Sequence, residues 1–514
     1  MVPRHPHSVS GGDWPLSKVE RWWRGTLTLT AAALLSRGLG LVYRLLLARY
    51  LGAQGLGFYQ MVFPLYLTLV TIVAGGMPVA VSQMVAEGRQ DVRRLGRASL
   101  LLGGALAVPL ALGLMAAAAP LAAVLYHDRR LAPMLALIAP AVVAVGLSSP
   151  LRGLYFGRQR MRVPAAAQVV EQVTRLGLLG LLAAGAPALW VPRGPLAAVV
   201  LIPLGEVASL VLMLWGFRRM AAEGPADRPH PVRLRTLAAR LLRLGTPVTL
   251  GRLLSSGMAL VEAAMIPRLL VAGGMTRVAA VSLFGQLAGM VMPLVFFPSA
   301  LSFALATNLV PAIAADQGQP ERQAAQMRRA LTVTALWCCP VTGLLWVLGP
   351  RVSHLLFATH LDPGLFHPLV LGAFAMNFNI VLAGGLRGLG RMGTPLYHDA
   401  LAAVLEMAAI FWLGSRPVLG PHVMVWAIAG GLGIAAVLNA TAAVRRFGRH
   451  PFLLSGAAAP ALAVMPAAVL WPALVRALSA ALPDWQAVGV ALAAGAGVYW
   501  LGLGWLGGAG WRQS

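Results

Sequence analysis

Three arginines interrupt an otherwise apolar stretch near the N-terminus, "LLSRGLGLVYRLLLARYLGA" at residues 34–53. Two of them, Arg37 and Arg44, lie two helical turns apart on nearly the same face, and their own span holds no acidic residue. An arginine at the centre of a bilayer costs about 2.5–3.5 kcal/mol on insertion scales. A desolvated guanidinium is well suited to bidentate contact with phosphate oxygens. The pattern therefore indicates an anionic, phosphate-bearing substrate; the alternative is burial against partners elsewhere in the fold.

A second apolar stretch, "GRLLSSGMALVEAAMIPRLL" at residues 251–270, carries Arg252, Glu262 and Arg268. It matches the first stretch weakly, with Arg268 opposite Arg49. If both stretches line one cleft, a cationic wall faces the isolated Glu262, which we predict to bind a coupling ion or a proton. Arg49 and Arg268 lie near the outer ends of their spans, where the alternative is that they reach toward the headgroups. The predicted substrate-binding residues are Arg37, Arg44, Arg49, Arg252 and Arg268.

An internal repeat places further charges within spans. The segments "LRGLYFGRQR" at 151 and "LRGLGRMGTP" at 386 are similar, and each is followed by a glutamate at the same spacing. Glu171 follows Arg152 as Glu406 follows Arg387. Glu171 and Arg175 are four residues apart, so we predict that they form a structural ion pair on one helix face within the membrane.

The sequence offers no pattern typical of a metal, cofactor or catalytic centre. Cys338 and Cys339 are adjacent inside an apolar span, which is typical of small core residues. The only lysine, Lys18, lies in the polar N-terminal tail, so the chain has no Walker A loop. Three histidines near one span end are more typical of surface residues than of metal ligands: His354, His360 and His367. We therefore expect no cofactor, no metal and no enzymatic activity.

The elements that must position these charges are membrane-spanning helices. The chain has 514 residues, of which 58% are hydrophobic and 11% charged, whereas soluble domains carry about 25% charged residues. The net charge of +25 resides mainly in short loops between apolar runs, which favours a membrane protein over a nucleic-acid-binding one. Runs of about 20 apolar residues predict membrane-spanning helices. We predict fourteen spans, near 27–48, 59–82, 98–126, 132–151, 164–187, 195–217, 241–267, 279–312, 330–357, 366–386, 396–415, 421–444, 453–478 and 485–508.

The predicted fold is an all-α polytopic membrane protein with two six-helix lobes and two appended C-terminal helices. Because each lobe has an even number of spans, the lobes share one orientation and are related by a pseudo-two-fold axis along the membrane normal. Basic loops alternate along the chain, which predicts a cell-membrane protein with both termini cytoplasmic. The predicted divisions are an N-terminal tail at 1–24, an N-lobe at 25–217, a cytoplasmic linker at 218–240, a C-lobe at 241–446, and two spans with a tail at 447–514.

Several segments resemble the stage V sporulation protein B family, which belongs to the MOP superfamily of multidrug, oligosaccharidyl-lipid and polysaccharide exporters. They include "LLSRGLGLVYRLLLARYLGAQGLGFYQMVFPLY", "GGMPVAVSQMVAEG", "RGLYFGRQRMRVPAAAQVVEQVTR" and "MIPRLLVAGGMTRVAAVSLFGQLAGMVMPLVFFPSALSF". The similarity covers roughly residues 25–450. It implies a MATE-like fold and a flippase for polyprenyl-diphosphate-linked saccharides, such as a lipid II-like precursor, used in spore cortex or cell-wall synthesis.

Partners and alternatives follow from this interpretation. We expect a monomer in the lipid bilayer that meets a lipid-linked oligosaccharide and cell-wall synthesis enzymes, but no nucleic acid. Lipid II flippases typically carry an Arg-Asp pair in the first span where this chain has Tyr43-Arg44, so the saccharide remains open. The first alternative is a MATE-type multidrug exporter coupled to a cation. The others are a membrane-bound glycosyltransferase or polymerase, and a scaffold without transport activity.

Overall fold

The computed structural model describes residues 16–87, 92–185, 187–222, 234–359, 361–416, 420–447 and 455–507. Within these ranges the chain folds into helices and forms no strand, which confirms the predicted all-α class. Much of the predicted N-terminal tail, the middle of the linker, the C-terminal tail and His360 lie outside the described residues.

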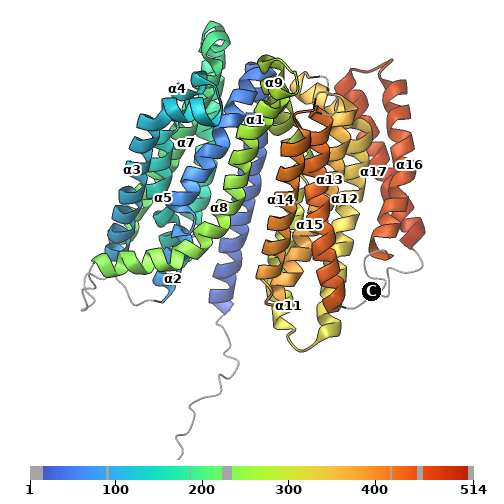
Figure 1. Ribbon diagram of the computed structural model, residues 1–514. Coiled ribbons are helices and arrows are strands. Elements are labelled where there is room, and N and C mark those ends of the chain that lie inside the picture. The colour runs from blue at the N-terminus through green and yellow to red at the C-terminus, as the bar shows by residue number, and fades with distance from the viewer. Residues whose placement is uncertain are drawn as a thin grey trace, which may run out of the picture. The chain divides into compact units, whose positions relative to one another are not determined.

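The helices follow one another with short connections (Figure 1). The first are α1 (Leu16–Ala74), α2 (Met77–Ala86), α3 (Val92–Leu125), the 3-10 helix η1 (Arg129–Leu131), α4 (Ala132–Leu137), α5 (Ala139–Gly157), α6 (Arg162–Gly185), α7 (Pro187–Ala222) and α8 (Leu234–Ala272). The remainder are α9 (Arg277–Phe284), the π-helix η2 (Gly285–Val291), α10 (Met292–Phe296), α11 (Ser299–Ala315), α12 (Pro320–Phe357), α13 (Pro363–Gly388), α14 (Gly393–Leu413), α15 (Gly420–Phe447), α16 (Ser455–Leu478) and α17 (Asp484–Gly507).

Helix α1 is long enough for two spans. Its 59 residues correspond to about 88 Å at 1.5 Å per residue, far more than the ~30 Å hydrocarbon core. The helix is interrupted at Gly52, whose φ of 66° and ψ of −178° are not helical. A side chain is rarely found at such a positive φ, which explains a glycine at this position. The first two predicted spans are therefore the two halves of α1.

By length and composition, twelve stretches of the described chain could cross a membrane. One stretch, Leu35–Ala86, holds the first two predicted spans. The predicted span at 164–187 corresponds to α6, which is 24 residues long but carries Glu171, Arg175 and two glutamines, so it is less apolar than the others. The other predicted spans each overlap one of these stretches. The chain is a multi-pass membrane protein.

The contacts divide the chain into two compact units whose sequences interleave. The first contains residues up to Tyr43 and then Val62–Leu260; the second contains Arg44–Met61 and then residues from Val261 onward. Segment 44–61 therefore belongs with the later helices. The predicted lobes at 25–217 and 241–446 follow the order of the sequence. They therefore place residues 44–61 in the first lobe and the start of α8 in the second, whereas the contacts group 44–61 with the second unit and α8 up to Leu260 with the first.

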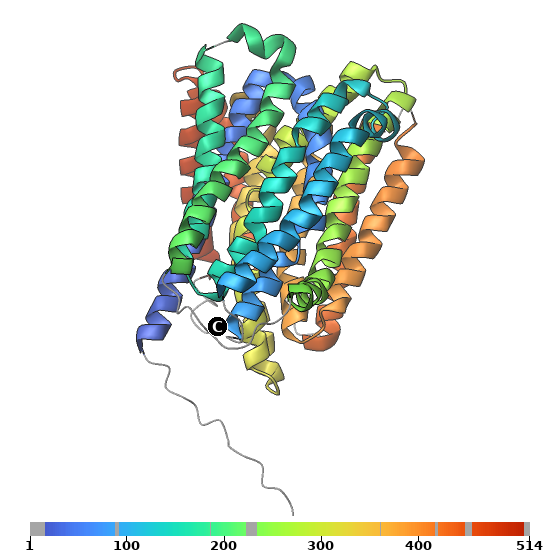
Figure 2. The ribbon, with the colours of Figure 1, turned by 90° about the vertical axis from the view of Figure 1, so that its left-hand side faces the viewer.

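In the first unit, α5 packs against α2, α3 and α7, and α6 packs against α7 (Figure 2, blue to green). Glycines bring these helices close together. A Cβ on Gly146 of α5 would lie 2.5 Å from the Cβ of Ala107, and one on Gly153 would lie 2.7 Å from the carbonyl oxygen of Pro78. Small residues at helix crossings are typical of membrane proteins. In a bilayer the hydrophobic effect does not drive helices together, so close van der Waals packing does so instead. Fully buried large side chains fill the space between the glycines: Met84, Leu95, Leu151 and Tyr155.

In the second unit, α13 packs against α11, α12 and α15, while α14 packs against α15 (Figure 1). The last two helices, α16 and α17, pack against each other and against α12. The indole of Trp471 occupies the space over Gly495, where any Cβ would collide with it. The hydroxyl of Tyr499 donates a hydrogen bond of 2.9 Å to the Leu336 carbonyl oxygen. The appended pair of helices is thus anchored to this unit.

Candidate functional site: charges within the membrane helices

The most enclosed charged cluster joins four helices of the first unit. Arg175 of α6 contacts Glu171 on the same helix at 3.1 Å and Glu206 of α7 at 3.0 Å. The hydroxyl of Tyr66 on α1 donates to the same Glu206 oxygen at 3.0 Å, and Arg152 of α5 lies 4.0 Å from Glu171. The three central side chains are about nine-tenths buried. The cluster therefore ties α1, α5, α6 and α7 together inside the apolar region.

The local sequence makes room for this cluster. Gly205 precedes Glu206 on α7, and a Cβ at this position would lie 2.7 Å from Nε of Arg175. The predicted pair of Glu171 and Arg175 is present as an ion pair. Sequence spacing alone did not reveal Glu206 or Tyr66 as partners, because they come from other helices. The available signal was an acid, Glu206, in the span after the one that holds Glu171 and Arg175, with no base three or four residues away from it.

Arg49 makes a definite contact within the second unit. Its Nε donates to the carbonyl oxygen of Leu356 at 2.9 Å and its Nη2 to that of Leu355 at 2.8 Å. These carbonyls belong to the last turn of α12, where backbone oxygens lack helical partners and a positive charge is favourable. Arg49 therefore connects α1 to the end of α12, and the predicted substrate contact of this residue remains a prediction.

The other four predicted arginines carry no ion pair with any residue that the structure describes. Arg37 and Arg252 belong to the first unit and are exposed. Arg44, which is half-buried, and Arg268, which is exposed, belong to the second. Their guanidinium groups are thus available to an anionic ligand, and their assignment as substrate-binding residues stays a prediction.

Two glutamates of the second unit, Glu262 on α8 and Glu406 on α14, are half-buried and lie near enough for their charges to interact. Neither forms an ion pair with a described residue. Glu406 packs closely on Gly431 of α15, where a Cβ would collide with its carboxyl group. In the internal repeat, the place of Arg175 is taken by Ile410. The second lobe therefore lacks the base that neutralises Glu171 in the first.

A chain of amides crosses three helices of the second unit. Asn439 of α15, which is fully buried, donates to Asn379 of α13 at 2.7 Å, and Asn379 donates to Asp399 of α14 at 3.1 Å. Nδ1 of His398 donates to the Asn439 oxygen at 2.8 Å, because an amide oxygen only accepts. Sequence patterns did not predict this chain of amides, since its members come from three separate spans.

The histidines and cysteines are placed as follows. Nε2 of His367 lies 2.9 Å from the Trp346 carbonyl oxygen, and its ring stacks on that tryptophan at 4.2 Å between centroids. Cys338 and Cys339 are buried free thiols. Among the described residues, no group of three or more His, Cys, Asp or Glu side chains could hold a metal ion.

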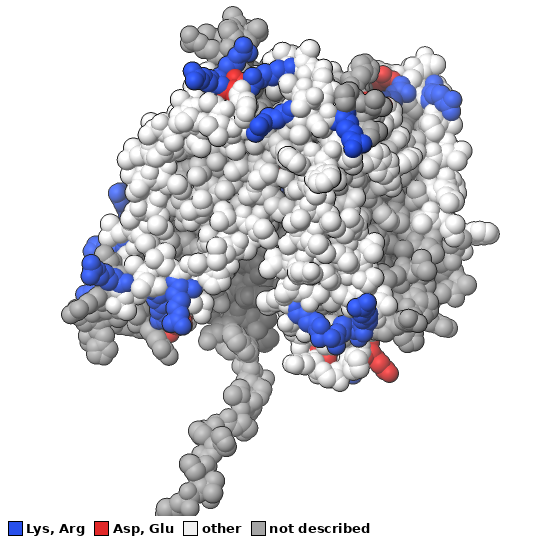
Figure 3. All heavy atoms as spheres, viewed as in Figure 1, with Lys and Arg blue, Asp and Glu red and all other residues white. Residues whose placement is uncertain are grey.

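Basic side chains are distributed differently from these buried charges. On the face seen in Figure 3, the basic side chains lie mostly toward the two ends of the helices. A broad uncharged surface lies between the basic side chains at one end and those at the other. This is the distribution expected of helices whose middles contact hydrocarbon.

Together, the spans and their internal charges define a polytopic helical membrane protein that keeps ionisable groups inside its spans. Residues 22–316 match the model of the polysaccharide biosynthesis protein family, and the chain belongs to that family. The chain is 28% identical over 437 residues to stage V sporulation protein B of Bacillus subtilis (strain 168), covering 81% of this chain and 82% of that one. This confirms the predicted resemblance.

Solved structures agree with the predicted fold class. An inward closed conformation of the lipid II flippase MurJ superposes with a TM-score of 0.70 at 12% identity, covering 93% of this chain and 98% of that one. An inward-facing multidrug resistance MATE transporter of the MOP superfamily gives 0.64 at 15% identity, with coverages of 80% and 94%. At these identities the likeness concerns the fold, and it confirms the predicted MOP-type architecture.

Proposed function

We propose that this chain is a flippase that moves a polyprenyl-diphosphate-linked saccharide from the inner to the outer leaflet by alternating access, for cell-wall or spore-cortex synthesis. The observation that carries the proposal is a set of in-span arginines without an acidic partner among the described residues, in a member of the polysaccharide biosynthesis protein family. A lipid diphosphate must cross the hydrocarbon region with its charges. Guanidinium groups replace its hydration, while the polyprenyl tail stays in lipid.

Arg37, Arg44, Arg252 and Arg268 are the proposed diphosphate ligands. Arginine is favoured for this role because its planar fork binds two phosphate oxygens and is weakly hydrated. Arg49 has a different place in the proposal: it holds the second unit's part of α1 to α12 through two backbone carbonyls, which positions Arg44 five residues before it. No bond is made or broken in the substrate, so the function requires no catalytic group.

Glu262, with Glu406 beside it, is the proposed site of a coupling proton or small cation. An acidic side chain within a membrane span costs free energy when no base neutralises it. Such a residue is therefore a functional-site candidate. The membrane potential also acts on the substrate, at about 2.3 kcal/mol per charge per 100 mV, and an inside-negative potential favours outward movement of an anion. We place both termini in the cytoplasm because the basic loops lie on the side of the N-terminal tail.

The second candidate function is cation-coupled multidrug export. The observation in its favour is the pair of unneutralised glutamates, Glu262 and Glu406, in a fold shared with a MATE transporter. A cationic drug would be repelled by the arginines of α1, which favours the flippase.

The test is a translocation assay in proteoliposomes with a fluorescent lipid-linked oligosaccharide. We expect Arg37→Ala and Arg44→Ala each to lower the flipping rate at least tenfold, because the diphosphate loses a desolvated partner. Arg97→Ala, which removes an exposed arginine of α3, is the matched control and should flip at the wild-type rate. Wild-type rates in both α1 variants would refute the assignment, and transport of ethidium but of no saccharide lipid would favour the exporter. Repeating the assay with several saccharides identifies the head group.

A further inference from the structure

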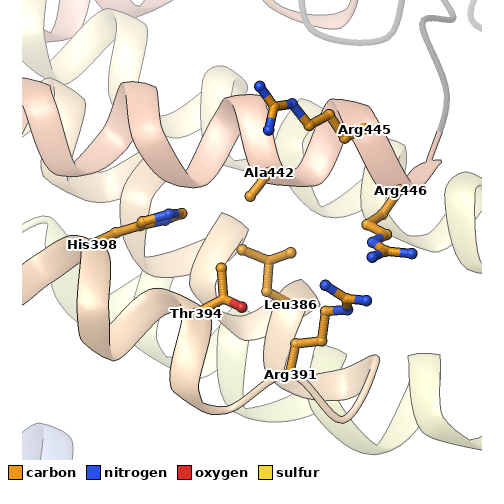
Figure 4. A pocket seen from close by; sticks show the side chains of 7 residues that line it. All are labelled: Leu386, Arg391, Thr394, His398, Ala442, Arg445 and Arg446. Carbon is orange, nitrogen blue, oxygen red and sulfur yellow. The ribbon is translucent and has the colours of Figure 1, made fainter.

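A cationic cavity opens in the second unit where α13 ends, α14 begins and α15 ends (Figure 4). Its volume is about 330 Å³, within the range of small-molecule sites. Arg391 points into it from the turn before α14, and His398 points into it from α14, while the last turn of α15 borders it on the other side. The lining residues are Leu386, Arg391, Thr394, His398, Ala442, Arg445 and Arg446.

The charge of this cavity is unbalanced. Three of its lining residues are arginines and none is acidic. Arg391, Arg445 and Arg446 are exposed, and none of them pairs with an acid among the residues that the structure describes. Like charges gathered around one space repel each other, and an anion in that space removes the repulsion. Paired oxygens of a phosphate fit the forked guanidinium better than a spherical anion does.

A buried hydrogen-bond network fixes the orientation of His398, one of the polar residues that line the cavity. His398 is fixed through Nδ1 by the buried Asn439, which is bonded in turn to Asn379. The opposite nitrogen of the ring, Nε2, is therefore left for the cavity, where it donates to an anion when the ring carries both protons. The hydroxyl group of Thr394 also lies there. A side chain anchored by a buried amide chain is oriented before any ligand arrives, which lowers the cost of binding.

The surroundings of the cavity suit an amphiphile. Leu386 and Ala442 supply an apolar part of the lining. Met392, Leu396 and Tyr397, at the start of α14, are large and exposed. Exposed apolar side chains beside a cationic pocket are what a lipid with a charged headgroup would cover.

We propose that this cavity binds a phosphate-bearing anion, its phosphate held by Arg391, Arg445 and Arg446, with Thr394 and His398 as further polar contacts. The site is separate in sequence and in helices from the arginines of α1 and α8. It does not depend on the proposed flippase function. The phosphate can be that of an anionic lipid headgroup or of a soluble phosphate compound, and the apolar border favours the lipid.

The test measures binding to the full chain in two arms. In the first, purified protein in nanodiscs of phosphatidylcholine receives increasing phosphatidylglycerol, and bound lipid is counted by native mass spectrometry. In the second, the protein in neutral detergent is titrated with inorganic pyrophosphate by calorimetry. The variant replaces the three arginines together: Arg391→Ala, Arg445→Ala and Arg446→Ala. The matched control removes the same charge from exposed arginines of the first unit: Arg94→Ala, Arg97→Ala and Arg235→Ala.

We expect the cavity variant to bind phosphatidylglycerol at least tenfold more weakly than wild type, and the control triple to bind it as wild type does. Arginine-dependent binding of pyrophosphate alone would also support the site and would assign it to a soluble ligand. Equal binding by all three proteins in both arms would overturn the proposal. The double variant Arg37→Ala and Arg44→Ala is measured in the same two arms. Binding that the cavity variant loses and this double variant keeps belongs to the cavity, which separates failure of this site from failure of the proposed transport site. A variant in which the three cavity arginines are replaced by lysine is measured as well. If it keeps the wild-type thermal midpoint, a loss of binding in it does not come from misfolding.

Discussion

At the scale of single residues, the cluster around Arg175 and the pair of Glu262 and Glu406 differ in how their charges are balanced. In the first unit, one arginine bridges two glutamates and a tyrosine adds a hydrogen bond. In the second unit, two carboxyl groups interact without a base among the described residues. The first arrangement stabilises helix packing, because all three side chains are enclosed. The second is the proposed site of a coupling proton or small cation.

This difference predicts unequal effects on stability. Glu206→Leu leaves Arg175 with one acid fewer and Tyr66 without its acceptor, and removing one partner of a buried pair costs about 3–5 kcal/mol. We expect a clear fall in the thermal midpoint of the purified protein in detergent. The control is Glu87→Gln, which breaks the exposed pair with Arg240, where the expected loss is about 0–1 kcal/mol. Equal midpoints for the two variants would contradict a structural role for the cluster.

A second residue-scale prediction concerns the driving force. Glu262→Gln keeps the shape of the side chain but cannot bind a proton or cation by charge. In proteoliposomes with imposed Na⁺ or pH gradients, we expect this variant to flip its substrate at a rate that no longer changes with either gradient. Glu406→Gln should weaken the same dependence, because the two carboxyl groups interact. A gradient dependence equal to that of the wild type in both variants would move the coupling site elsewhere.

At the scale of helices, glycine contacts decide how the segment at 53–60 joins the second unit. Gly57 of α1 faces the carbonyl oxygen of Val281, and Gly285 of η2 faces that of Ala53, so that a Cβ on either glycine would collide with backbone. Gln60 then donates to the Ala288 carbonyl oxygen at 2.7 Å, within the π-helix. The close approach of two backbones explains the grouping of these residues with α9 and η2.

We therefore expect Gly57→Ala to be destabilising by about 1–3 kcal/mol, because a backbone carbonyl cannot move aside as a flexible side chain does. The thermal midpoint and the yield of folded protein in detergent report the loss. Gly113→Ala in α3 is the control, since nothing lies within 4 Å of the added methyl group. A control that lost as much stability as Gly57→Ala would contradict the explanation by packing, because alanine favours a helix more than glycine does.

The sequence predicted the positions of the helices better than the contacts between them. Apolar runs and loop signals placed most spans within a few residues of the helices, because a bilayer fixes the length of a span. The i,i+4 spacing also identified Glu171 and Arg175, which share one helix. The contact of Glu206 with Arg175 and the amide chain through Asn439 were not predicted, because these contacts join different helices and depend on how the helices rotate and pack. Arg49 was assigned from its charge, whereas its contact with α12 depends on where that helix ends.

At the scale of the whole molecule, the orientation in the membrane is the property most directly open to test. With Cys338 and Cys339 replaced by alanine, single cysteines at Arg130 and Arg158 sample the loops before α4 and after α5. Both positions are exposed. We expect a membrane-impermeant maleimide to label Arg130→Cys in intact cells and Arg158→Cys only after lysis. The reverse pattern would place both termini outside and would contradict the orientation inferred from basic loops.

The interleaving of the two units has a consequence for the two helices that carry the predicted substrate-binding and ion-binding residues. The chain passes from one unit to the other between Tyr43 and Arg44 in α1, and again between Leu260 and Val261 in α8. Arg37 is thus separated from Arg44 by one crossing, and Arg252 from Glu262 by the other. Each of these two helices therefore has residues in both units, so the backbone that carries a predicted site residue of one unit continues directly into the backbone that carries a predicted site residue of the other.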